Sequence, residues 1–169
     1  MEIDTATIRR LRDALIESGK LVESSEEPQS ANAESRQLAS LKRVAPFAET
    51  MYLMMMADGE AAANEKAAIR GALNMLTHGF VEQQLLDDML EDCEKIASEQ
   101  GVEFRLQSIG SHLCADRQDR ETAFTLAAAV AIADQRVDVE ESSLMDSIAE
   151  WYGISGKRSR EIVQQIEAG

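Results

Sequence analysis

Apolar residues recur at intervals of three and four over most of this chain, the spacing of one face of an α-helix. The first twenty residues carry one such stripe, and residues 81–98 carry a broader one. The same pattern predicts helices ending at 57 and over 64–76, 104–114, 121–133, 142–151 and 159–167. No segment of useful length alternates between apolar and polar residues with period two, so we expect no strands.

The pattern divides the chain into three parts. Residues 1–22 form a predicted amphipathic helix that docks either on its own domain or on a partner. Residues 23–35 are rich in Ser, Glu, Gln and Asn, a composition that cannot offset its ordering entropy, so we interpret them as a flexible linker. Residues 36–169 form the predicted compact helical domain, in which Pro46 either begins a new helix or kinks a continuous one.

A short acidic signature occurs twice, each time at the end of an apolar run. The first copy reads Met55-Met56-Ala57-Asp58-Gly59-Glu60 and continues to Glu65; the second reads Ala131-Ile132-Ala133-Asp134-Gln135-Arg136 and continues to Glu141. Positions 58 and 134 are 76 residues apart, as are positions 65 and 141. A constant offset indicates an internal duplication. We therefore predict an all-α bundle of about seven to eight helices, built from two related helix-turn-helix halves.

The duplicated turns bring carboxylates together and are candidate sites for hard cations. Such ions take oxygen ligands, so each turn predicts a weak site for a divalent cation such as Ca²⁺, Mg²⁺ or Mn²⁺. Neither copy has the alternating acidic ligands of an EF-hand loop. The candidate metal ligands are Asp58, Glu60 and Glu65 in the first copy, and Asp134, Asp138 and Glu141, together with Glu140, in the second.

A purely structural role explains the same residues without a metal. An Asp after a helix accepts backbone N–H groups in an Asx-turn, and acidic residues in a first helical turn favour the helix dipole. Asp138 followed by Glu141 is close to a capping box, whereas the equivalent position in the first copy is Ala62, a poor cap. The residues alone leave both roles open.

The paired acidic turns, each between a buried helix and an amphipathic one, resemble the TerB-like family associated with bacterial tellurite resistance. The resemblance covers about residue 36 to the C-terminus. It implies an entirely helical bundle of two related halves, a non-enzymatic role in bacterial stress or metal resistance, and divalent-cation binding by acidic clusters. It carries over to Asp58, Gly59 and Glu65, and to Asp134 and Glu141, with Gln135 in place of the glycine.

Composition limits the classes of partner. The formal net charge is −14 and the isoelectric point is about 4.5, which disfavours nucleic acid and anionic membrane as ligands. Cations and basic protein surfaces are better matched to the negative charge of this chain. The longest nearly apolar segment, residues 123–133, is shorter than a membrane span. The N-terminus lacks the pattern of a signal peptide, so we expect a cytoplasmic protein with Cys93 and Cys114 reduced.

Other chemical signals have simpler interpretations. The run of Met51, Met54, Met55 and Met56 indicates a segment buried on most sides rather than a soft-metal site. His112 and Cys114 match no zinc-site spacing, and two residues apart on a helix they do not face each other as a base and a nucleophile would. We predict no catalytic residues and no enzymatic activity.

The resulting prediction is a non-enzymatic, cation-responsive or protein-interaction module in a bacterial stress or tellurite-resistance system. Its partners would be other proteins, including stress-response components. A small basic island at Lys157, Arg158 and Arg160 either contacts an acidic partner, or binds the acidic surface of a second copy to form a homodimer, or is only the solvated start of a helix. The alternative is a scaffold or adaptor without metal binding, which uses the N-terminal helix and exposed helix faces to bind proteins.

Overall fold

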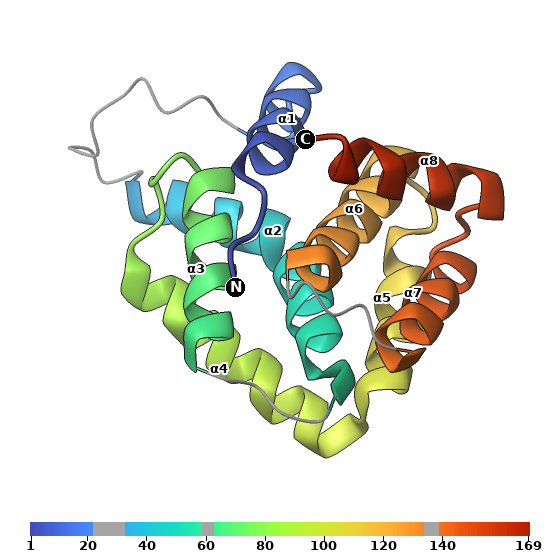
Figure 1. Cartoon of the computed structure of the whole chain (residues 1–169). Helices are drawn as coiled ribbons and strands as arrows, with labels where there is room; N and C mark the ends of the chain where they lie inside the picture. The colour runs from blue at the N-terminus through green and yellow to red at the C-terminus, as the bar shows by residue number, and fades with distance from the viewer. Residues whose placement is uncertain (22–32, 59–62, 134–138) are drawn as a thin grey trace.

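The computed structural model describes residues 1–21, 33–58, 63–133 and 139–169, with the backbone alone for residues 33, 58, 140 and 141. In these residues every regular element is a helix (Figure 1). This confirms the prediction of an all-α fold. The elements are α1 (Thr5–Glu17), α2 (Ala33–Met55), the 3₁₀ helix η1 (Met56–Asp58), α3 (Ala63–Leu76), α4 (Gln83–Gln100), α5 (Val102–Leu113), α6 (Arg117–Ala133), α7 (Val139–Trp151) and α8 (Gly156–Glu167).

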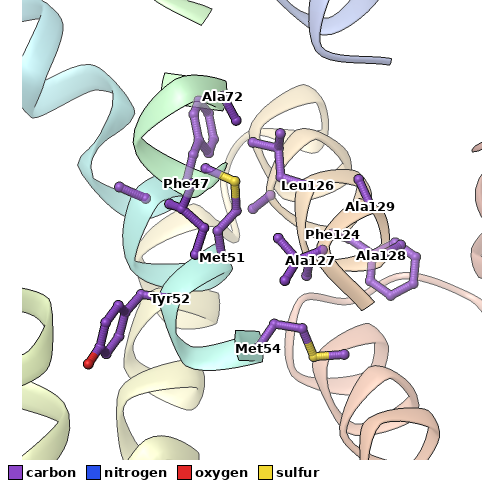
Figure 2. Packing of buried hydrophobic residues seen from close by; sticks show 14 of the residues in the cluster. Phe47, Met51, Tyr52, Met54, Ala72, Phe124, Leu126, Ala127, Ala128 and Ala129 are labelled. Atoms are coloured by element: carbon purple, nitrogen blue, oxygen red, sulfur yellow. The ribbon is translucent and has the colours of Figure 1, made fainter. Parts of the chain in front are cut away.

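The centre of the molecule is the packing of α2 against α6. Phe47 and Met51 of α2 lie beside Leu126 and Ala127 of α6, while Tyr52 points away from α6 (Figure 2). Met51, Met54 and Met55 are each at most 5% exposed, which confirms core packing as the role of these residues. Small residues on α6 let the two helices approach closely, because alanine adds little bulk to a contact.

The remaining helices cover these two. α3 and α4 pack on α2 and on each other, while α7 and α8 pack on α6 and α5 packs on both α6 and α7. α6 begins four residues earlier than predicted, at Arg117. The reason is an N-cap: a carboxylate oxygen of Asp116 accepts the backbone N–H of Asp119 at 3.1 Å.

The N-terminal helix docks on the chain's own domain, one of the two arrangements that the sequence left open. α1 contacts α3 and α6, and its Ile8 and Leu15 are fully buried. Asp4 caps the helix by accepting the Thr7 backbone N–H at 2.8 Å. Beyond the helix, Lys20 pairs with Asp116 at 2.6 Å and with the buried Asp119 at 3.3 Å. The apolar face of α1 is therefore occupied in this structure.

Pro46 lies inside the single helix α2, so it does not begin a new helix. Proline cannot donate a backbone hydrogen bond to the preceding turn. One turn later, the Thr50 hydroxyl donates to the Pro46 carbonyl oxygen at 2.7 Å and also pairs with the Tyr152 hydroxyl at 2.7 Å. This second contact joins α2 to the end of α7.

The contact between α5 and α7 requires a glycine. A Cβ at Gly110 would lie 2.5 Å from the carbonyl oxygen of Trp151, closer than such atoms approach in proteins. The clashing atom belongs to the backbone, so no side-chain rotation can relieve it. Gly110 thus sets the distance between these helices.

An ion pair between α6 and α8 makes stability depend on pH. Glu121 accepts from Nε and Nη2 of Arg158 at 3.0 and 3.1 Å, and this guanidinium holds the pKa of Glu121 below its ordinary value of 4.5. A carboxyl with a lowered folded-state pKa stabilises the fold above its unfolded pKa and loses that contribution as pH falls through the folded value. We expect the urea midpoint of the wild type to fall more steeply below pH 4.5 than that of Glu121→Gln.

The matched control is Glu91→Gln, on the exposed face of α4. It should retain the pH dependence of the wild type. Equal slopes for the wild type and Glu121→Gln between pH 5 and pH 3 would show that this pair does not contribute.

Candidate functional site

The helices on either side of the two acidic segments follow one another in the same order in both copies. The first follows α2 and η1 and precedes α3, and the second follows α6 and precedes α7. α3 begins at residue 63 and α7 at residue 139, which are 76 residues apart, the same offset as in the sequence. Each turn therefore follows one of the two helices that form the centre of the core, and each leads into a helix of the outer layer.

The segments beside the two turns also meet in space. α7, which follows the second turn, contacts η1, which ends at Asp58 of the first. The end of α2 and the beginning of α7 lie at the same end of the bundle (Figure 1). The sequence did not indicate this contact, because residues from different copies approach only through the folding of the whole domain. Charge at one turn can therefore act on a helix that belongs to the other.

The structure places one of the seven candidate metal ligands with its side chain. Glu65 is half-buried in the first turn of α3, where its charge favours the helix dipole. The backbone of Asp58 ends η1 and those of Glu140 and Glu141 lie in α7, but the three side chains lie outside the described part of the structure. Glu60, Asp134 and Asp138 lie outside the described residues altogether.

Elsewhere in the fold the acidic side chains are spread out or paired with cations. Among the side chains that the structure describes, no three His, Cys, Asp or Glu residues are grouped so that they could hold a metal ion. Lys66, next to Glu65 in the chain, donates to Glu94 of α4 at 3.0 Å. Arg70, one turn later, donates to Asp87 of α4 at 3.1 Å. These pairs direct both cations of α3 toward α4.

The two cysteines have different environments. Cys93 is buried on α4, and its burial raises the pKa of the thiol to about 12, so it stays protonated at neutral pH. Cys114 is exposed at the end of α5. We expect iodoacetamide to label Cys114 in the native protein and to label Cys93 only after denaturation, because the thiolate is the reactive form. Mass spectrometry of the peptides checks this, and rapid native labelling of Cys93 would contradict the structure.

The length and hydropathy of the described helices show whether any of them could span a membrane. Within residues 1–21, 33–58, 63–133 and 139–169, none is both long and apolar enough to cross a bilayer.

The sequence of most of the described domain matches one known protein family. Residues 45–164 match the family model described as "Tellurite resistance protein TerB". The chain belongs to this family. The match runs from the second half of α2 into α8, so it contains both acidic turns and leaves α1 outside. Neither curated proteins nor solved structures give a significant match to the chain.

Family membership confirms the resemblance inferred from the duplicated turns. It associates the domain with tellurite resistance, and both central helices, α2 and α6, lie at least partly within the matched region. A fold can serve several functions, so the action of this TerB domain has to be argued from its own residues.

Proposed function

We propose that this TerB domain is a non-enzymatic, cation-responsive module that interacts with other proteins in a bacterial stress or tellurite-resistance system. In this mechanism a divalent cation such as Ca²⁺, Mg²⁺ or Mn²⁺ binds the carboxylates of one or both acidic turns. It neutralises their mutual repulsion, and the helices that follow the turns change orientation or expose a different surface. The protein would act in the cytoplasm, alone or as a homodimer.

The contact between η1 and α7 is the observation that supports this proposal most. Asp58 and Glu65 flank the first turn, and Glu141 lies on the helix that reaches η1. Carboxylates near the junction of the two copies repel one another in a chain of net charge −14, and a bound cation reduces that repulsion. A cation at the junction would therefore act on both halves of the domain.

The helix contacts provide a path from the turns to the surface. α3 begins at the first turn and packs on α1, while α7 begins at the second turn and packs on α5 and α8. A small rotation of α3 would change the surface under α1, and a rotation of α7 would change the face shared with α8. Packed helices switch between discrete arrangements. A local change in charge at a turn can therefore change the shape of these more distant surfaces.

Isothermal titration of the metal-free protein with Ca²⁺, Mg²⁺ and Mn²⁺ tests the proposal. We expect saturable binding to the wild type, and loss of the first site in the double variant Asp58→Asn, Glu65→Gln, because both substitutions remove anionic oxygen ligands with little change in shape. Asp134→Asn tests the second turn in the same way. Asp92→Asn is the matched control, since it removes one negative charge from an exposed position on α4.

The proposal requires Asp92→Asn to bind as the wild type does. Equal binding by the wild type, the double variant and Asp134→Asn would contradict it, and so would the absence of saturable heat with all three cations. The thermal unfolding of each variant is measured in parallel, so that a lost site is not confused with a lost fold.

A further inference from the structure

A small basic pocket lies away from both acidic turns. A cavity of about 190 Å³ opens between the start of α6, the turn that joins α7 to α8, and the start of α8. Its polar lining comes from Arg117, Arg120, Glu121, Ser155 and Arg158, with Gly153 in the wall. Arg117 begins α6, and the 17 residues of this helix separate the pocket from Ala133, the last described residue before the second acidic segment, by about 25 Å.

The charge of this pocket is opposite to that of the chain. Three guanidinium groups line it with the carboxylate of Glu121, and Glu161 beside the pocket also pairs with Arg158 at 3.3 Å, which leaves a local net charge of +1 in a protein of net charge −14. Glu121 accepts from Nε and Nη2 of Arg158, and from Nε of Arg117 at 3.2 Å. Two carboxylates, Glu121 and Glu161, thus orient Arg117 and Arg158, while Arg120 has no carboxylate partner among the described residues.

Arg120 is held in place by the backbone and keeps donors available. Its Nη1 donates to the carbonyl oxygens of Tyr152 and Gly153 at 3.3 and 3.2 Å, where α7 ends. Gly153 has a φ of 68°, and a Cβ there would lie 2.6 Å from the same Nη1. The Nε of Arg120 is buried and has no hydrogen-bond partner among the described residues. The Nε of Arg43 is in the same state elsewhere in the fold. Arg120 therefore offers a ligand the other N–H donors of its guanidinium, which has five in all.

We infer that this pocket binds a small oxyanion, either a free anion such as phosphate or the phosphate group of a larger ligand. Guanidinium groups pair with oxyanions through several parallel N–H donors, which a fixed cluster of arginines provides. The cavity has room for an anion with a few waters, given that each water in liquid occupies about 30 Å³. The start of α8 adds positive potential on the same side. This binding is independent of the cation response proposed for the turns.

Titration of the full chain with inorganic phosphate, followed by ¹H–¹⁵N NMR, tests the inference. The expected result is saturable shifts of the Gly153 and Ser155 amides and of the Arg120 and Arg158 Nε–H signals. Arg117 is the residue to change, because its side chain is 77% exposed and its substitution should leave the fold intact. Arg117→Gln should weaken binding about tenfold, the effect of losing one charged donor.

Two controls separate site binding from general screening. Arg9→Gln removes the same charge from an exposed position on α1 and should bind phosphate as the wild type does. A parallel titration with sodium chloride at equal ionic strength should give only small, unsaturable shifts. Phosphoserine as a second probe distinguishes the sources: tighter binding than inorganic phosphate indicates a protein-borne phosphate group, and weaker binding indicates a free anion.

Shifts that do not saturate, or that sodium chloride reproduces, would overturn the inference. It would also be overturned if Arg117→Gln and the wild type bound phosphate equally well. Because the acidic turns take no part in this titration, failure here leaves the cation-binding experiment unaffected.

Discussion

Replacing Leu15 by alanine is expected to lower the free energy of unfolding by about 2–5 kcal/mol, the range measured for fully buried leucines. Leu15 has no exposed surface, and the helix that carries it packs on α3 and α6. The substitution removes buried methyl groups and leaves a cavity that this contact can close only in part. Chemical denaturation with urea measures the change.

Leu38→Ala is the matched control, because Leu38 is on α2 but 53% exposed. It should change the free energy of unfolding by less than about 0.5 kcal/mol, as surface substitutions usually do. If Leu15→Ala is no more destabilising than Leu38→Ala, α1 is not docked as the structure describes. A docked α1 also means that deletion of residues 1–35 would destabilise the domain, so that deletion cannot by itself identify a partner-binding arm.

Replacing Asp119 by asparagine is expected to lower the free energy of unfolding by about 3 kcal/mol, since removal of one partner leaves buried charge uncompensated. Asp119 is 8% exposed and accepts from Arg43 Nη2 at 2.6 Å and from Lys20 Nζ at 3.3 Å. The substitution removes the negative charge that faces the Nη2 of Arg43, whose Nε is already buried without a partner in the described structure. Urea denaturation again gives the value.

A double-mutant cycle with Lys20→Met assigns part of this cost to the ion pair. Asp119→Asn should cost less in the Lys20→Met background, by about 1 kcal/mol, because residues in contact are energetically coupled. Asp92→Asn on the exposed face of α4 should have little effect on stability. Additive effects of Lys20→Met and Asp119→Asn would contradict a direct interaction between the two side chains.

The helices could be predicted from sequence because a helix with one buried face has apolar residues every three or four positions. The apolar stripe of α4 and the nearly continuous apolar segment of α6 each correspond to a helix in the structure. The first residue of a helix was predicted less accurately where a polar N-cap residue determines it. Asp116 begins α6 and Ser155 begins α8, each ahead of the first apolar residue, and neither adds to the apolar periodicity.

The candidate sites show a different limit. Repetition made the acidic turns recognisable, but the contact of η1 with α7 depends on how the two copies pack. The arginine pocket had a partial signal, since Arg158 belongs to a visible basic island. Arg117 and Arg120 lie about forty residues earlier, and only the packing of α6 on α8 brings them to it. The buried Asp119 had no signal either, because its partners Lys20 and Arg43 are distant in sequence.

Manganese-induced line broadening in ¹H–¹⁵N NMR spectra would locate a cation site in this protein, because the paramagnetic ion broadens the amides near its binding site. Mn²⁺ takes the same oxygen ligands as Mg²⁺ and Ca²⁺. We expect substoichiometric Mn²⁺ to broaden the amides of residues 58–65 and 134–141 first, while those of the exposed acids Asp88, Glu91 and Asp92 on α4 keep their intensity. Broadening centred on α4, or spread evenly over all acidic residues, would contradict a cation site at the duplicated turns.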